Sequence, residues 1–215
     1  MNTASSNLVV AQHPLVQHHL AQLRSADTPP AEFRRLVHRL AALLAYEATG
    51  DLLLGPVRIR TPLVETLCHR VAGRVGLIPI LRAGLGMVDP VLEFLPDAEV
   101  WHLGLYRDEA TATPVEYYSK LPSSNPVDVA LVLDPMLATG GSISVALATL
   151  RRWGVPRLKV VSLIASRQGV ESLQEQFPDV QIYVGAVDPI LNDHKFIVPG
   201  LGDAGDRIFN TLHHP

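Results

Sequence analysis

Apolar residues gather in short, dense runs along the chain, and polar or glycine-rich stretches separate these runs. Several runs are rich in β-branched residues, which is typical of strands buried on both faces of a sheet. They predict strands at 75–81, 99–105, 129–133, 158–164 and 180–186. Apolar residues at helical spacing follow two of the strands, one set up to Trp153 and the other over 170–177. Strands that alternate with helices in this way predict a mostly parallel sheet with helices on both faces.

The first fifty or so residues carry a helical pattern instead. A helix is predicted from Pro14, and a second helix with a 3.6-residue apolar stripe follows the break at 27–30. The alternation at 57–61 then predicts a short, half-exposed strand. A proline at the start of 62–71 predicts a third helix over that range, with Cys68 as a small buried residue on it.

Composition narrows the class of protein. The chain has 215 residues, 47% of them hydrophobic and 18% charged, with a mean hydropathy of +0.20. The length fits one domain, and the apolar balance indicates that a partner subunit covers part of the surface. The net charge of −3 gives no support for a nucleic-acid surface. No apolar segment approaches the length of a membrane span, and the first residues do not predict a secretion signal. The single cysteine excludes an intrachain disulfide and fits a reducing cytoplasm.

The segment from 127 to 149 holds the strongest chemical signal. Its buried strand ends at Asp134, and the small-residue loop at 139–142 leads into a helix. Such a loop aims unpaired backbone N–H groups and the positive end of a helix dipole at one point, which suits a phosphate. Asp134 is placed to accept hydrogen bonds from sugar hydroxyls beside that point. The alternative is a plain strand–helix turn with a glycine bend and a serine cap.

Two common nucleotide-binding motifs are absent from this segment. It is not a Walker A loop, because no lysine lies between Asp134 and Trp153. The G-x-G-x-x-G spacing of dinucleotide-binding folds is also missing. Elsewhere, no grouping of histidines and cysteines has the spacing of zinc ligands.

A second candidate anion site follows the strand at 75–81. Arg82 stands at the carboxyl end of that strand, and two glycines, Gly84 and Gly86, come shortly after it. Alone, this pattern also fits a simple tight turn. Together with the first loop, it fits a ligand that carries two separate phosphate groups.

Two further stretches are too polar for core elements. Residues 106–120 lie between two core strands, and they fit either an active-site flap or a plain solvated hairpin. Residues 188–210 are too polar and glycine-rich to predict another helix–strand unit. They fit either a C-terminal loop packed on the core or a segment that clamps a flat ring and reads its edge with main-chain groups.

Three strings in these segments resemble one known family. DPMLATGGS (134–142) is similar to the phosphoribosyl pyrophosphate (PRPP) loop of the type I phosphoribosyltransferases, and more specifically to that of the uracil phosphoribosyltransferases. PILRAGLGM (79–87) is similar to their pyrophosphate loop, and PGLGDAGD (199–206) to their uracil-recognition segment. Most of the superfamily has two adjacent acids in the PRPP loop. Here the second position is Pro135, a departure that the uracil branch shares.

The resemblance implies the type I phosphoribosyltransferase fold. This is an α/β fold with a mostly parallel twisted sheet, helices on both faces, a flexible β-arm or loop, and a C-terminal hood that recognises the base. Residues 1–215 would form a single domain. Its parts would be N-terminal helices at 1–50, the flexible loop at 106–120 and the uracil-recognition segment at 188–211.

The resemblance also implies roles for particular residues. The catalytic residues would be Arg82, Arg107 and Asp203. The contacts to PRPP would come from Arg82, Arg107, Asp134, Pro135, Met136, Leu137, Ala138, Thr139, Gly140, Gly141, Ser142 and Asp203. The contacts to uracil would come from Ile197, Gly202, Asp203 and Ala204.

The implied reaction joins uracil and PRPP to give UMP and pyrophosphate in pyrimidine salvage. PRPP would carry Mg²⁺ into the site, so no protein metal site is expected. The expected partners are the two small-molecule substrates and further copies of the chain in a homodimer or larger oligomer, with no nucleic acid and no membrane. GTP activates some relatives, and this sequence neither establishes nor excludes such an activator. The three motifs hold no histidine, so no general base is assigned beyond the location of Asp203.

Three alternatives remain. The nearest is a phosphoribosyltransferase for another base, which the single acid before Pro135 and the segment at 202–204 disfavour. A regulator that keeps the fold but binds RNA is disfavoured by the acidic charge balance. A catalytically inactive scaffold is disfavoured because the motif positions are filled.

Overall fold

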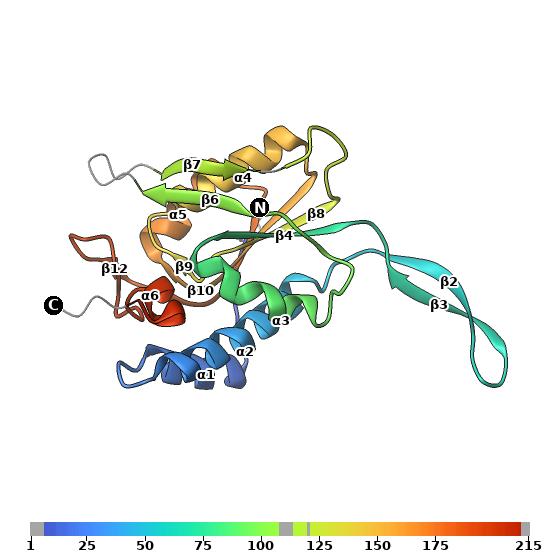
Figure 1. The fold of residues 1–215 in the computed structure, drawn as a ribbon, viewed down its shortest axis with the longest axis horizontal. Coiled ribbons are helices and arrows are strands. Elements are labelled where there is room, and N and C mark those ends of the chain that lie inside the picture. Colours follow the sequence, from blue (N-terminus) through green and yellow to red (C-terminus); the bar gives the residue numbers. More distant parts are fainter. Residues whose placement is uncertain (1–6, 108–113, 120, 212–215) are drawn as a thin grey trace, which may run out of the picture.

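The computed structural model describes residues 7–107, 114–119 and 121–211, and a twisted sheet forms its centre (Figure 1). The strands of this sheet are β1 (Leu8–Val10), β4 (Val75–Leu81), β5 (Glu99–Val100), β6 (Leu103–Arg107), β7 (Pro114–Ser119), β8 (Val129–Leu133), β9 (Met136–Leu137), β10 (Arg157–Ser166) and β11 (Gln181–Asp188). Their order is β1-β11-β10-β8-β4-β6-β7, with β5 beside β4 and β9 beside β10. Neighbours are parallel except β6 and β7, which are antiparallel.

Helices cover both faces of the sheet (Figure 1). One face carries α1 (Pro14–Arg24), α2 (Pro30–Ala48), the 3₁₀ turn η1 (Ala83–Met87), α3 (Val88–Leu92) and α6 (Ala204–Phe209). The other face carries α4 (Gly141–Trp153) and α5 (Arg167–Gln176). Successive residues of β8 enter the two apolar clusters in turn, which explains why the whole strand is buried and apolar. Among the described residues, no helix has the length and apolar character needed to cross a membrane.

The predicted α/β architecture is therefore confirmed, but its strands differ in detail. β9 was not predicted, and β7 lies in the segment predicted as a flexible β-arm or loop. The strand predicted at 99–105 is divided into β5 and β6, which are separated by Trp101 and His102. The short strand β1 was not predicted before the first helix. It pairs in parallel with β11 at the edge of the sheet, and three residues are too few to show a period in the sequence.

The helix predicted over 62–71 is wrong. Its residues form β3 (Glu65–Val71), which pairs antiparallel with β2 (Leu54–Arg60) in a separate two-stranded sheet that projects from the body (Figure 1). The hydroxyl of Thr61 accepts hydrogen bonds from the N–H groups of Leu63 and Val64, so Pro62 lies in a hairpin turn and does not begin a helix. Cys68 accordingly lies half-buried on a strand, not buried on a helix.

The C-terminal tail is more regular than predicted. A small hairpin of β12 (Ile190–Leu191) and β13 (Ile197–Val198) precedes the one-and-a-half-turn helix α6. The carboxylate of Asp203 caps α6 by accepting a hydrogen bond of 2.9 Å from the N–H of Asp206. A helix this short shows too little periodicity to be found from the sequence among so many glycines.

Candidate active site

The order of the strands defines where a ligand can bind. From β4 the chain first continues to β6 and β7 on one side, and it then returns to add β8, β10 and β11 on the other side. The order in which strands are added to the sheet therefore reverses between β4 and β8. In open parallel sheets the crevice at the carboxyl ends of such a strand pair is the usual ligand site. The two anion loops predicted from the sequence leave β4 and β8 at this point.

The loop after β8 forms a small concave surface at the start of α4. Asp134 and residues 136–143 line it. Gly140 takes a left-handed conformation with φ +83° just before the helix, and it has no side chain with which to cap the first turn. Residues 140–143 at the start of α4 line this hollow, and the N–H of Gly141 lies 3.5 Å from the hydroxyl of Thr139. A helix start of this kind is a common anion site. The side chain of Leu137 is buried in the core, so only its main chain can face a ligand.

Asp134 lies partly buried where β8 ends, and its environment disfavours the charged form. Burial raises the pKa of Asp134 to about 7. A hydrogen bond of 3.3 Å from the N–H of Met136 acts in the opposite direction, and the nearby negative charge of Asp203 raises the pKa further. A ligand that donates hydroxyl hydrogens to this carboxyl would favour the ionised form.

The substrate-free protein is expected to lose stability with rising pH, because Asp134 ionises at a lower pH in the unfolded state than in the folded state. Because the pKa of Asp134 rises from 3.8 to about 7 on folding, only the folded state holds this proton between those values. The free energy of unfolding therefore falls as pH rises through that window. Asp134→Asn cannot ionise, so we expect the wild-type melting temperature to fall relative to this variant between about pH 4 and about pH 8. Melting curves across that range test this, and a constant difference between the two proteins would contradict it.

The loop after β4 touches the end of β8. A Cβ added to Gly84 would lie 2.3 Å from the carbonyl oxygen of Leu133, so the two backbones are in direct contact there. Arg82, directly after β4, is exposed and forms an ion pair of 3.2 Å with Asp206. The peptide bond between Leu81 and Arg82 is cis. The loop after β4 thus lies against Leu133, the residue that leads into the loop at 134–142.

The C-terminal segment lies against the same site. Met136 and Ala138 line a cavity of about 220 Å³ together with Asp203, His194, Lys195 and Phe196. Gly202 is exposed with φ +79°. The side chains of Ile197 and Ala204 are buried in the core, so contacts from these two residues to a ligand have to come from the main chain.

Only the backbone of Arg107 is described. Arg107 is the last residue of β6, in the strand beside β4, and its backbone pairs with Pro114. Its side chain lies outside the described residues, and so do residues 108–113 and 120 of the flexible loop predicted at 106–120. The described residues at 106–107 and 114–119 of that loop belong to β6 and β7.

Sequence reasoning missed two residues that support the PRPP-like loop. The hydroxyl of Ser166 donates a hydrogen bond of 2.5 Å to the carbonyl of Ala138 and accepts one of 2.9 Å from the N–H of Gly169. A Cβ on Gly169 would lie 2.2 Å from that same carbonyl oxygen. The start of α5 therefore supports the loop from behind. A glycine directly before the helix predicted at 170–177 was the one available signal.

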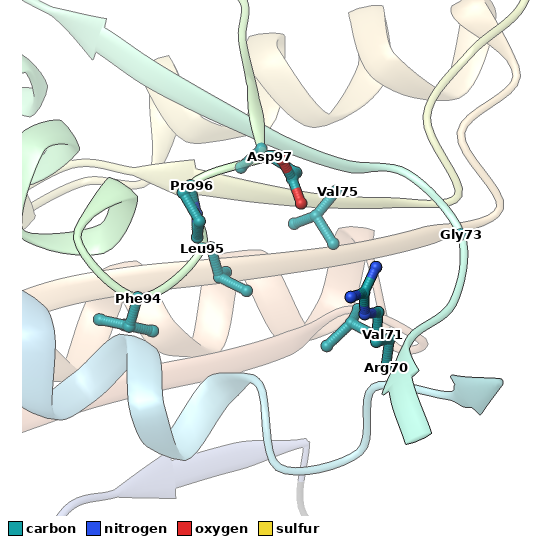
Figure 2. Close-up of a pocket in the computed structure, with 9 residues that line it drawn as sticks. Arg70, Val71, Gly73, Val75, Phe94, Leu95, Pro96 and Asp97 are labelled. Carbon is teal, nitrogen blue, oxygen red and sulfur yellow. The ribbon is translucent and has the colours of Figure 1, made fainter. Parts of the chain in front are cut away.

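Another cavity lies away from this site. It measures about 300 Å³ and lies between the base of the β2–β3 hairpin and the loop after α3 (Figure 2). The guanidinium of Arg70 and the carboxylate of Asp97 are its charged groups, and none of the predicted site residues lines it. In the described part of the chain, no group of three or more histidine, cysteine, aspartate or glutamate side chains is arranged to hold a metal.

Comparison with known proteins agrees with this geometry. The family model of uracil phosphoribosyltransferase matches residues 9–211. A uracil phosphoribosyltransferase of Roseiflexus sp. (strain RS-1) is 57% identical over 206 residues, which is 96% of this chain and 99% of the relative. The enzyme of the same description from Symbiobacterium thermophilum is 54% identical over 207 residues, or 96% and 99% of the two chains.

A solved structure of a protein from Aquifex aeolicus has a TM-score of 0.91 at 37% identity, and the match covers 96% of this chain and all of that one (100%). With the sheet and its two adjoining loops, these matches define the type I phosphoribosyltransferase class, α/β enzymes that transfer a pentosyl group. Within that class, the chain belongs to the uracil phosphoribosyltransferase family.

Proposed function

We propose that this chain transfers the phosphoribosyl group of PRPP to uracil, releasing UMP and pyrophosphate in pyrimidine salvage. The observation that carries the proposal is the contact of Gly84, in the loop after β4, with Leu133 at the end of β8, which brings the starts of the two loops together. PRPP bears a 5′-phosphate and a pyrophosphate, and two adjoining anion loops suit that pair. Family membership supports the choice of uracil as the base.

Each part of PRPP has a proposed partner. The 5′-phosphate binds the start of α4 through main-chain N–H groups and the hydroxyls of Thr139 and Ser142. The ribose hydroxyls donate to Asp134, the acid at the end of β8. Arg82 and Arg107 bind the pyrophosphate. The main chain at 134–142 completes the contact, since several of its side chains are buried.

Uracil binds in the cavity between this loop and the C-terminal segment. Main-chain groups of Ile197 and of residues 202–204 read the edge of the ring, because two of the side chains are already buried in the core. This mode needs no charged side chain and suits a small neutral base. Asp203 lies within this segment and lines the cavity, so its carboxylate reaches toward PRPP as well.

Catalysis rests mainly on charge. As the bond at the anomeric carbon breaks, negative charge grows on the pyrophosphate, and Arg82 and Arg107 stabilise it. Asp134 and Asp203 are too few for a metal cage, but one or two carboxylates beside substrate phosphates suit Mg²⁺ carried in by PRPP. Bound in that way, Mg²⁺ supplies positive charge beside the departing group. The segment at 197–204 holds uracil N1 toward the anomeric carbon, which lowers the entropic cost of the reaction.

The proposal is tested by measuring nucleotide formation from PRPP and Mg²⁺ with uracil, cytosine, hypoxanthine or orotate in parallel. Product from uracil alone is expected. Product from another base would keep the PRPP site and reject the assignment of residues 197–204. If PRPP binds but no base reacts, the RNA-binding regulator replaces the enzyme as the best account.

Arg107→Ala is expected to lower kcat about 10²-fold while the binding of uracil changes little, since the lost charge acts on the pyrophosphate. Steady-state kinetics with each substrate varied in turn measure this. Arg107→Lys is the matched control, because it keeps the charge and should recover part of the rate. An unchanged kcat in the alanine variant would remove Arg107 from the mechanism.

We also propose a homodimer or larger homo-oligomer in which the β2–β3 hairpin packs on another copy of the chain. A two-stranded hairpin is marginally stable alone, and this one projects from the body (Figure 1). It exposes a group of large apolar side chains, which are Leu54 62%, Leu63 95%, Val64 63% and Leu67 60% exposed. Such a patch is typical of a protein–protein interface.

Leu67→Asp is therefore expected to weaken self-association at least about tenfold, because it places a charge in the proposed interface. Analytical ultracentrifugation over a range of concentrations measures this. Glu65→Gln, at an exposed polar position on the same strand, is the control and should associate as the wild type does. Equal association of both variants would reject the hairpin as the interface.

Two expectations rest on the resemblance and composition alone. GTP is proposed as an activator, and a rate that is unchanged when GTP is added to the assay would reject it. A cytoplasmic location is proposed because the chain has a single cysteine and PRPP, one of its proposed substrates, is a phosphorylated metabolite.

A further inference from the structure

The turn at 197–202, which carries the proposed uracil site, is held by hydrogen bonds to the main chain of Gly200. The N–H of Gly200 donates a hydrogen bond of 2.9 Å to Asp188, and its carbonyl accepts one of 2.8 Å from the guanidinium of Arg24. Arg24 also donates to both oxygens of Asp188, at 2.7 Å each. Both main-chain polar groups of one glycine are thus bound by the two partners of a single ion pair, and the four groups form a closed ring.

This ion pair is well placed to resist movement. The side chain of Asp188 is 7% exposed and that of Arg24 is 23% exposed. A forked arginine–carboxylate pair with little access to water is strong and has a fixed geometry. Arg24 is the last residue of α1 and Asp188 is the last residue of β11, so the pair joins a helix, the sheet and the turn.

The turn itself has little freedom to adjust. Gly200 has φ +62°, and a Cβ at this position would lie 2.0 Å from the carbonyl oxygen of Ile197. Ile197 begins the proposed uracil-reading stretch and Gly202 continues it two residues after Gly200. Fixing the peptide groups of Gly200 therefore fixes the direction in which the neighbouring main-chain donors and acceptors point.

We infer that Arg24 and Asp188 are positioning residues for uracil: their ion pair holds the main chain of the turn at 197–202 in the conformation that binds the base. This inference rests on the proposed function, and it deepens that function by assigning two residues that do not touch the substrate. Without the pair the turn samples other conformations, so the base binds less often while the PRPP loops stay intact.

A purely structural role would give a different result from a positioning role. Loss of any buried ion pair lowers stability. Only a positioning role raises KM for uracil while kcat and KM for PRPP stay near their wild-type values. The matched control is the forked pair of Arg74 and Glu99, with distances of 2.6 and 2.9 Å, which joins the starts of β4 and β5 away from the turn.

The test compares Asp188→Asn, Arg24→Lys and Glu99→Gln with the wild type. Asp188→Asn keeps an acceptor for Gly200 but loses the charge, and we expect it to raise KM for uracil about tenfold or more. Arg24→Lys keeps the charge but not the fork, so its KM should lie between those of the wild type and Asp188→Asn. Glu99→Gln should leave KM for uracil within about twofold of wild type at a comparable loss of melting temperature.

Hydrogen exchange in the same proteins gives a readout that does not depend on catalysis. In Asp188→Asn we expect faster exchange in peptides that cover 197–202, with no change over 75–81. Equal KM for uracil in Asp188→Asn and Glu99→Gln, or unchanged exchange at 197–202, would overturn the inference. Neither result affects the test of the proposed function, which is whether the wild type forms UMP. If the wild type forms no UMP, the uracil role falls with the proposed function, whatever the exchange data show about the turn.

Discussion

Replacing Arg82 with alanine is expected to lower kcat/KM for PRPP by about 10²- to 10³-fold, the usual effect of removing a donor that stabilises developing negative charge. Arg82 directly follows β4, two residues before the contact of Gly84 with Leu133. Its ion pair with Asp206 is half-exposed, so exchanging that partner for pyrophosphate costs little. For the same reason the melting temperature should change little in this variant.

Two controls accompany this experiment. Arg82→Lys keeps a positive charge and should lose less activity than the alanine variant. Asp206→Asn removes the ion pair that Arg82 forms without substrate but leaves the arginine in place. The kcat/KM for PRPP should therefore stay within about tenfold of wild type. A value for Arg82→Ala that equals the wild-type value would remove the arginine from pyrophosphate binding.

Gly84→Ala is expected to lower kcat about 10²-fold, because misplacing a catalytic loop by about 1 Å has an effect of this size. The new methyl group would lie 2.3 Å from the carbonyl of Leu133 and 3.2 Å from the backbone of Pro79. Neither neighbour is a flexible side chain, so one of the two strands has to move. The melting temperature should fall in the same variant.

Gly86→Ala is the matched control two residues further along the same loop. There the added Cβ would lie 3.3 Å from Cδ1 of Ile208, the tip of a side chain that can turn away. Its kcat is expected to stay within about threefold of wild type. Equal activity of the Gly84 and Gly86 variants would show that close contact between the loops does not matter for the reaction.

The sheet and its loops could be predicted from the sequence because local patterns report them. β4 and β8 are buried on both faces, so they appear as dense apolar runs, and glycines with a charged residue follow each run. The path of the chain brings the two loops together whatever the details of packing. For these reasons the predicted strands at 75–81 and 129–133 agree with the structure, and the predicted family agrees with the comparisons.

The strand predicted at 57–61 overlaps β2, whose burial alternates along the strand, but its partner β3 was not predicted. Six of the seven residues of β3 are exposed, so no buried face imposes a period on this strand. Pro62 gave a misleading signal because proline favours the first turn of a helix and the corner of a tight turn equally well. No second sequence pattern indicated that β3 pairs with β2 across this short turn.

Long-range pairs were also beyond local patterns. Arg24 and Asp188 are separated by 164 positions, and Ser166 supports a loop 28 residues before it. Nothing near either position in the sequence distinguishes these side chains from ordinary surface residues. Only the folded backbone brings them to the turn and the loop that they hold.

A crystal structure of the protein with UMP and pyrophosphate tests the central claim most directly. We predict that the nucleotide phosphate lies at the start of α4 against residues 139–142, with pyrophosphate at Arg82 and the uracil ring against the main chain of 197–204. The site at the carboxyl ends of β4 and β8 would then be the catalytic site. A nucleotide in the cavity beside Arg70 and Asp97 (Figure 2), with the loops after β4 and β8 empty, would contradict this account.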